Sequence, residues 1–393
     1  MTTGIIITIC ILLLIAYLFD VTSILTKIPP VILLLLVGWM ARQTTRVFNV
    51  HLPDFSAILP IFGTIGLILI VLEGSLELEL NKSKIGLIKK SFFGALFSII
   101  ALAVTLGYLF HYFGNYPLKL SLINAVPLCV ISSAIAIPTV RYLATADKEF
   151  VIYESSLSDI MGVLLFNFVS LNKNFGATSF GNFGLQILTI TIVSFVATIG
   201  LSLLLNKIEH HIKFIPIILL VILIYSVSKI YHLPGLIFIL IFGLFLGNLD
   251  ELKRFPWINK FRPAELDKEV KKFKELIIEG TFLVRSLFFL LFGYLIETAE
   301  LLNTKTLIWS AGIVAAIFIF RALQLKVSKL PLTPLLFIAP RGLITILLFL
   351  SIHPGQNIDL VNKSLITQVI VLSALLMMVG LLATKKEIKI TGQ

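Results

Sequence analysis

A single aspartate stands inside an apolar stretch long enough to cross a lipid bilayer. Asp159 lies in the segment Tyr-Glu-Ser-Ser-Leu-Ser-Asp-Ile-Met-Gly, within a predicted helix over residues 150–172. A charged side chain at the bilayer centre costs about 2.5–3.5 kcal/mol on insertion scales, so such residues usually serve a function. The structural alternative is a carboxylate paired with a buried arginine. We interpret Asp159 as the principal candidate for a binding site.

Helical spacing selects the neighbours of Asp159. Ser155 lies four residues earlier and therefore on the same face of the helix. A hydroxyl beside a carboxylate provides the hard oxygen ligands that suit alkali cations. Ser158 could hydrogen-bond a neighbouring helix or simply allow close packing, and the sequence leaves both roles open. Glu154 is five residues from Asp159, points away from it and needs another partner.

Arg341, in the sequence Ala-Pro-Arg-Gly, is the counter-charge that we assign to Glu154. Pairing would spare both groups the full cost of burial, so we predict a structural ion pair between Glu154 and Arg341. Glu73 is the third carboxylate at membrane depth, either as a second ligand or as an interfacial residue. The six histidines lie in or at the edge of predicted loops without metal-ligand spacing on one helix, so we expect no transition-metal site.

The composition identifies lipid as the solvent of this chain. Of its 393 residues, 58% are hydrophobic and 13% are charged, and the mean hydropathy is +1.02. A soluble domain has roughly 45–50% apolar and about 25% charged residues. Too few polar residues remain to cover a soluble fold. We therefore predict an all-α polytopic membrane protein.

About thirteen apolar segments are long enough to cross or nearly cross a bilayer. The number is even if one of the two short segments, 28–42 or 234–248, does not span. The predicted segments are 4–19, 28–42, 56–79, 86–113, 118–145, 150–172, 182–206, 213–230, 234–248, 277–297, 305–327, 331–351 and 364–384.

The distribution of basic residues predicts the orientation, because lysine and arginine are enriched in cytoplasmic loops. With the N-terminus outside, the cytoplasmic loops and tail hold 23 of the 32 basic residues, and Arg285 and Arg341 fall within apolar segments. We therefore predict an external N-terminus, a cytoplasmic C-terminus and an odd number of helices. This topology explains the net charge of +11 without nucleic acid. The seven basic residues predicted to lie in the external loops are Arg42, Arg46, Lys119, Lys173, Lys229, Lys305 and Lys363.

Two of the predicted helices carry helix-breaking residues. They are the fifth, 118–145, and the twelfth, 331–351, which match in position if helices 1–6 and 8–13 form two inverted repeats. Paired broken helices of this kind indicate a transporter's midplane site, although prolines also kink ordinary membrane helices. We expect Ser132 and Ser133 to join the site. The breaking residues are Pro127, Ser132, Ser133 and Pro138 in the fifth helix, and Pro331, Pro334, Pro340 and Gly342 in the twelfth.

Five stretches of the chain form a recognisable set in their order and spacing: residues 28–32, 72–78, 154–159, 285–289 and 340–342. Together they resemble the sodium/proton exchanger family of the monovalent cation:proton antiporter superfamily. The family's helix six commonly reads Glu-Ser-Leu-Leu-Asn-Asp, and its final Asp, the shared cation and proton site, falls on Asp159. The preceding Asn falls on Ser158. Helix five of the family commonly has Thr-Asp-Pro, where this chain has Ser-Ser-Ala over residues 132–134.

The resemblance implies a fold and an activity. It implies crossed, partly unwound helices 5 and 12, a homodimer, and alternating access in which protons exchange for Na+ or Li+ across the cell (inner) membrane. The predicted divisions of the single domain, 1–393, are an ion-translocating core (85–173 and 304–385), a scaffold and dimer bundle (4–80 and 213–298), a linking helix (182–207) and a cytoplasmic loop (249–276).

The predicted ion-binding residues are Asp159, Ser155, Ser132, Ser133, Ser158 and Glu73, with Asp159 alone exchanging one proton for one cation. No cofactor is expected beyond the transported ions. The alternatives are a K+/H+ antiporter, a membrane-embedded enzyme, and a non-transporting sensor. The enzyme would need acids or histidines clustered at a helix end, where only Glu77 and Glu79 lie close together. The sensor rests only on the absent helix-five Asp.

Overall fold

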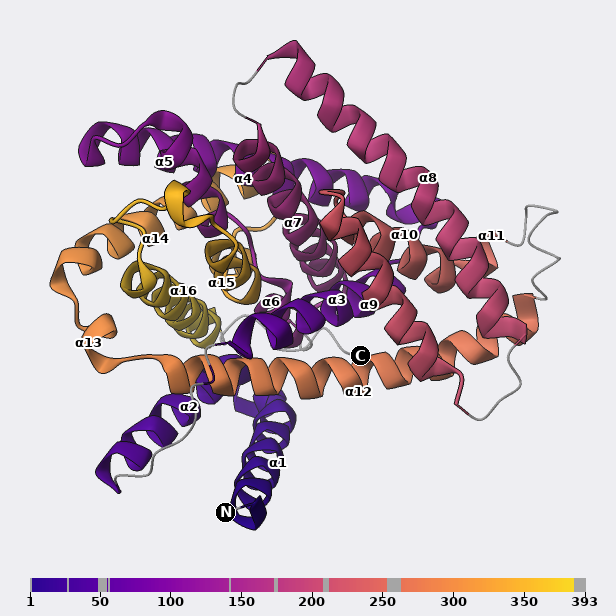
Figure 1. Cartoon of the computed structure of the whole chain (residues 1–393), viewed down its shortest axis with the longest axis horizontal. Coiled ribbons are helices and arrows are strands. Elements are labelled where there is room, and N and C mark those ends of the chain that lie inside the picture. Colours follow the sequence, from indigo (N-terminus) through magenta and orange to yellow (C-terminus); the bar gives the residue numbers. More distant parts are fainter. Residues whose placement is uncertain are drawn as a thin grey trace. The chain divides into compact units, whose positions relative to one another are not determined.

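The computed structural model is helical, and it has no strand in the residues that it describes, which are 2–26, 28–48, 55, 57–140, 143–172, 176–207, 212–252 and 263–384 (Figure 1). The helices are α1 (Thr2–Thr26), α2 (Pro30–Val47), α3 (Leu59–Glu77), α4 (Ile85–Gly114), α5 (Leu118–Ala125), α6 (Ser133–Thr139), α7 (Thr145–Leu171), α8 (Ala177–Lys207), α9 (Phe214–Ile230), α10 (Leu236–Gly247), α11 (Leu249–Leu252), α12 (Pro263–Leu295), α13 (Thr298–Leu301), α14 (Thr304–Val327), α15 (Leu343–Leu350) and α16 (Lys363–Ala383). Short 3-10 turns include η1 (Lys82–Lys84), η2 (Val126–Leu128), η4 (Leu335–Phe337) and η5 (Pro354–Gln356).

Each of the thirteen predicted segments contains helix, which confirms the all-helical membrane fold. Within the described part of the chain, seven helices are long and apolar enough to cross a membrane: α3, α4, the broken helix Leu118–Thr139, α8, α12, α14 and α16. Helix α7 is not among them, because its polar residues lower its mean hydropathy. That thirteen helices span the bilayer stays a prediction.

The segment predicted as a cytoplasmic loop, 249–276, is partly helical. Helix α12 begins at Pro263, fourteen residues before the predicted start at 277, and continues into the apolar part of the chain. Leu266, Val270 and Phe273 are buried along this extension, which makes it an amphipathic continuation of the spanning helix. Residues 253–262, with four basic side chains of the predicted loop, lie outside the described residues.

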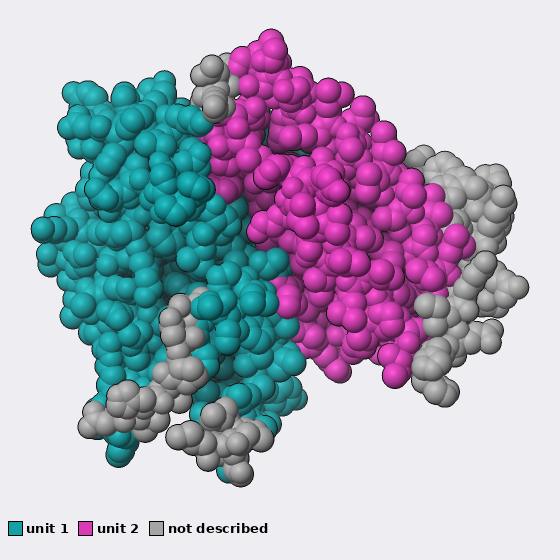
Figure 2. All heavy atoms as spheres, in the orientation of Figure 1, with its two compact units in different colours: residues 1–64, 91–162, 283–393 teal, residues 65–90, 163–282 magenta. Residues whose placement is uncertain are grey.

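The chain divides into two compact units (Figure 2). Unit 1 comprises Met1–Thr64, Ser91–Gly162 and Leu283–Gln393, and unit 2 comprises Ile65–Lys90 and Val163–Phe282. Unit 1 contains both broken helices and five of the predicted ion-binding residues: Ser132, Ser133, Ser155, Ser158 and Asp159. Glu73 belongs to unit 2. The functional division into core and scaffold bundles stays a prediction.

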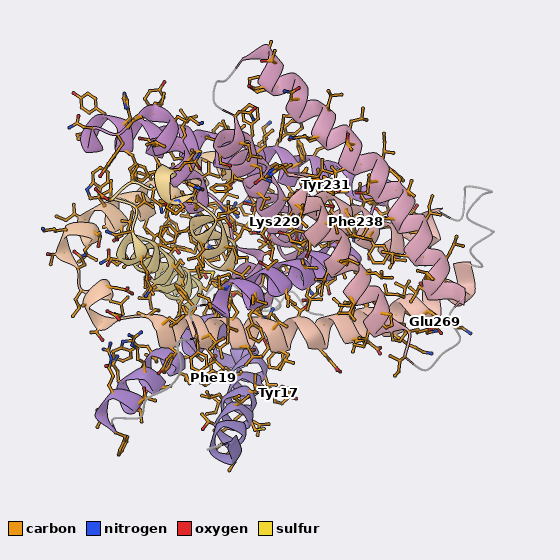
Figure 3. The ribbon with its side chains drawn as sticks, viewed as in Figure 1. Tyr17, Phe19, Lys229, Tyr231, Phe238 and Glu269 are labelled. Atoms are coloured by element: carbon orange, nitrogen blue, oxygen red, sulfur yellow. The ribbon has the colours of Figure 1, made fainter. Side chains whose placement is uncertain are left out.

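Apolar side chains cover much of the helix surface. On α1, Leu14 is 64% exposed and Tyr17 is 57% exposed, and Figure 3 labels Tyr17 on this helix. Helices α8 and α9 also expose large apolar side chains, including Val196 and Leu219. Contiguous apolar surface of this extent is unfavourable in water but is solvated by lipid chains. The surface therefore agrees with a multi-pass membrane protein.

Unit 2 is held together by helix packing and by a few polar ties. Helix α8 packs beside α10 (Figure 1). The amide of Asn248, which follows α10, donates to the carbonyl of Leu78 at 2.7 Å, and its oxygen accepts from the N–H of Leu80 at 2.5 Å. Glu269 on α12, labelled in Figure 3, pairs with Lys213. The two hydrogen bonds of Asn248 fix the chain where it leaves α3.

Candidate functional site

The first broken helix of unit 1 consists of α5, η2 and α6. Pro127 lies in η2 and Pro138 lies inside α6, and each removes one backbone donor from the helix. Residues 129–132 between the two halves are not helical. All four are buried, so their backbone groups need partners other than a helix ladder.

The second broken helix consists of η4 and α15. Its first half is shorter than predicted: one 3-10 turn over 335–337 rather than an α-helix from Pro331. The prolines at 331 and 334 explain the difference, because proline disfavours helical backbone in the residue before it. Residues 338–342 are extended and buried, and α15 begins at Leu343.

The two extended segments contact each other directly. The N–H of Ser132 donates to the carbonyl of Pro340 at 2.9 Å. A Cβ at Gly342 would lie 2.6 Å from Cδ1 of Ile135 and 2.9 Å from Oγ of Ser132, so this crossing leaves no room for a larger residue. The predicted crossing of two partly unwound helices is confirmed.

Asp159 lies at this crossing. Its side chain is buried on α7, and Oγ of Ser133, the first residue of α6, donates a hydrogen bond to its Oδ2. Its Oδ1 is also buried and has no hydrogen-bond partner among the described residues, and the same holds for Oγ of Ser132. A buried polar atom without a partner is costly, so such atoms commonly mark a place for an ion or water. The crossing therefore holds two buried oxygens without a partner among the described residues, one of Asp159 and one of Ser132.

The structure places the other predicted ligands as follows. Ser155 is buried on α7, where its hydroxyl lies 3.5 Å from the carbonyl of Ile152 on the same helix. Ser158 is buried one residue before Asp159. Glu73 is buried on α3 and belongs to unit 2, whereas Asp159 belongs to unit 1. The roles of Ser155 and Glu73 in ion binding stay predictions.

Glu154 is paired with Arg321, not with Arg341. The Nη1 of Arg321 on α14 lies 2.5 Å from Oε1 of Glu154, and both side chains are at most 2% exposed. Gln324, one turn later on α14, donates its amide to the same carboxylate oxygen. The guanidinium also lies over the ring of Phe150, 5.8 Å from its centroid. The predicted ion pair between Glu154 and Arg341 is therefore wrong.

Arg341 instead satisfies backbone carbonyls of the broken helices. Its Nε donates to the carbonyl of Leu128 at 2.7 Å, and its Nη1 donates to the carbonyl of Ala339 at 3.1 Å. Leu128 is the last residue of η2, where the helix ladder stops and carbonyls lose their partners. A cationic side chain at such an end is favourable. Arg341 thus stabilises the break itself.

Sequence reasoning missed Arg321. It lies inside the predicted segment 305–327, but it was counted among the cytoplasmic charges together with Lys326 and Lys329. The structure places it inside α14, so 22 rather than 23 basic residues remain in the cytoplasmic count. The available signal was its place between Phe320 and Ala322 in an apolar run, with a polar Gln324 on the same face.

The family model described as "Sodium/hydrogen exchanger, transmembrane" matches residues 9–384. The chain belongs to the sodium/hydrogen exchanger family. No curated protein matches the sequence significantly.

This exchanger shares its fold with solved structures. The structure of the sodium proton antiporter MjNhaP1 from Methanocaldococcus jannaschii at pH 8 matches with a TM-score of 0.67 and 19% identity, over 97% of this chain and 96% of that one. An electron-microscopy map of MjNhaP1 matches with a TM-score of 0.70 and 21% identity, over 99% and 100% of the two chains.

Ser158 stands where the exchanger family commonly has asparagine. Its Oγ accepts a hydrogen bond from the N–H of Ile131 at 2.9 Å, in the extended segment of the first broken helix. The two roles that the sequence left open were a hydrogen bond to a neighbouring element and close packing, and the structure has the hydrogen bond. Ser158 thus holds the backbone beside Asp159.

Proposed function

We propose that this exchanger is a secondary antiporter that exchanges one proton for one monovalent cation, Na+ or Li+, across the cell membrane by alternating access. One observation carries the proposal: a buried carboxylate, Asp159, has an oxygen without a partner at the crossing of two broken helices. Membership of the exchanger family and the structural similarity to MjNhaP1, a sodium proton antiporter, support the same activity.

The proposed mechanism is competition for one carboxylate. Asp159 binds either the cation or the proton, so loading one ion releases the other. The hydroxyls of Ser132 and Ser133 and backbone carbonyls of the extended segments supply further oxygen ligands to the cation. We expect Ser155, four residues before Asp159 on α7, to add another.

The charge of the loaded site supports one-for-one exchange. Asp159 carries the same net charge, zero, whether a proton or a monovalent cation neutralises it. Glu154 already has Arg321 as its counter-charge, so it need not exchange protons during the cycle. Each half-cycle then moves the same charge, and the complete cycle is electroneutral.

The proposed membrane orientation rests on the distribution of basic residues, and the proposed homodimer rests on the family. We place the N-terminus outside and the C-terminus in the cytoplasm, and we propose a homodimer. Residues 385–393, which contain three of the predicted cytoplasmic lysines, lie outside the described residues.

Proteoliposomes test the function. Purified protein is reconstituted with an imposed pH gradient, and Na+, Li+ and K+ are added separately while a fluorescent dye reports the gradient. We expect Na+ and Li+ to dissipate the gradient and K+ to have little effect. Dissipation by K+ alone would replace the proposal with a K+/H+ antiporter, and no response to any cation would contradict transport.

A further inference from the structure

Ser373 holds the second extended segment. Its Oγ on α16 accepts a hydrogen bond from the backbone N–H of Arg341 at 3.1 Å. The same hydroxyl donates to the carbonyl of Ile370, one turn earlier, at 3.1 Å. Ser373 is fully buried, so no water replaces this contact.

This contact repeats the contact that Ser158 makes with the first segment. Ile131 lies two residues before the start of α6, and Arg341 lies two residues before the start of α15. Each N–H is accepted by a serine on the next long helix along the chain, α7 or α16. The two breaks therefore share one local arrangement, although their sequences show no repeat.

The residues that follow the two serines differ in charge. Asp159 follows Ser158, whereas Ala374 follows Ser373. The second broken helix therefore has a serine that contacts its backbone, as the first does, but it has no carboxylate beside that serine. The hydrogen bonds of Ser373 join backbone groups, the N–H of Arg341 and the carbonyl of Ile370, which is the contact pattern of a positioning residue.

We propose that Ser373 is a positioning residue of the cation site, which fixes the segment 338–342 so that Pro340 can hold Ser132 beside Asp159. The inference rests on the proposed function. Arg341, whose N–H Ser373 accepts, is adjacent to Pro340, whose carbonyl accepts from Ser132. Without the hydroxyl, a buried N–H loses its partner and the segment becomes free to shift. The ligands must then be ordered when the cation binds, which lowers affinity.

The test compares Ser373→Ala, Ser373→Thr and a matched control, Ser310→Ala. Ser310 is fully buried on α14 and donates to the carbonyl of Leu307 one turn earlier, so its variant loses the same kind of intrahelical bond without touching the crossing. Exchange is measured against Na+ concentration in proteoliposomes. We expect Ser373→Ala to raise the KM for Na+ by about five-fold with kcat changed by less than about two-fold, as the loss of one hydrogen bond predicts.

Ser373→Thr keeps a hydroxyl and should restore the KM, and Ser310→Ala should leave it unchanged. A KM for Ser373→Ala equal to that of the unmodified protein would overturn the proposal. An equal rise in Ser310→Ala would also overturn it, because the effect would then be general to buried serines.

Hydrogen–deuterium exchange of the peptide containing residues 338–342 gives a readout that does not depend on transport. We expect faster exchange in Ser373→Ala than in Ser373→Thr or Ser310→Ala. If the unmodified protein exchanges no cation, the proposed function fails by itself. Unchanged deuterium uptake in Ser373→Ala would then still reject the positioning role.

Discussion

Two carboxylates lie five residues apart on α7 and have different surroundings. Glu154 receives hydrogen bonds from the guanidinium of Arg321 and the amide of Gln324. Asp159 receives a hydrogen bond from Ser133 and keeps one buried oxygen unused. A carboxylate that is paired with a cationic side chain, like Glu154, is suited to a structural role. A carboxylate without such a partner, like Asp159, is suited to binding an exchangeable cation.

The first prediction at this scale concerns Asp159. Asp159→Asn keeps the size of the side chain but removes the charge, so exchange should fall to the background of protein-free liposomes. Asp147→Asn, the same change in the first turn of α7, is the control and should keep full exchange. The assay is cation-induced dissipation of a pH gradient. Substantial exchange by Asp159→Asn would remove Asp159 from the mechanism.

A second prediction concerns the buried ion pair. Removing either Glu154 or Arg321 leaves the other charge buried and unpaired, which costs about 3–5 kcal/mol. Each single alanine variant should therefore unfold at a lower temperature, and the double variant should lose less than the sum. Thermal unfolding in detergent measures this double-mutant cycle. The cycle of Glu154 with Arg341 is the comparison and should show a weaker coupling; the reverse order would restore the pairing rejected above.

At the scale of the elements, the crossing depends on a close approach between α6 and the segment before α15. Gly342→Ala would push a Cβ against Ile135 and Ser132. We expect this change to destabilise the protein by about 1–3 kcal/mol, as overpacking does, and to raise the KM for Na+. Thermal unfolding and the Na+ dependence of exchange measure the two effects.

Gly312→Ala is the matched control for this element. Gly312 lies within α14, and a Cβ there would meet no atom within 4 Å. Because alanine favours helix over glycine, this variant should be as stable as the unmodified protein or slightly more stable. If Gly342→Ala behaves in the same way, the crossing is looser than the described geometry.

At the scale of the whole molecule, the stoichiometry follows from the number of exchangeable acids. The buried carboxylates among the described residues are Glu73, Glu154 and Asp159, and Glu154 is already paired. If Asp159 alone exchanges, the steady-state pH gradient should not respond to an imposed membrane potential. Reconstituted exchange with valinomycin-clamped potentials measures this. A gradient that shifts with voltage would contradict one-for-one exchange and make Glu73 the next residue to mutate.

The orientation is also a property of the whole molecule. Lys271 on α12 and Lys305 on α14 are both exposed and lie on opposite sides of the predicted topology. After Cys10 and Cys129 are replaced, Lys271→Cys should react with an impermeant thiol reagent only from the cytoplasm. Lys305→Cys should react only from outside. The opposite pattern would reverse the predicted orientation.

The sequence by itself determined the class of protein, most helices and the place of both breaks. Apolar length and composition decide whether a segment enters lipid, and proline positions decide where a helix stops, so both are local properties. Asp159 could be selected in the same way, because one charge in an apolar run is visible without knowing its neighbours. The length of the first half of the second broken helix was less accurate, since the prolines at 331 and 334 reduced it to one turn.

Only the tertiary structure decided which groups meet. The sequence analysis assigned Arg341 to Glu154 and counted Arg321 among the cytoplasmic charges, because helical spacing states which residues share a face and not which helix that face contacts. Packing places α14 against Glu154 and turns Arg341 toward the carbonyls of η2. The hydrogen bond from Arg341 to Ser373 could not be predicted from the sequence either, because it joins residues 32 positions apart through one backbone N–H.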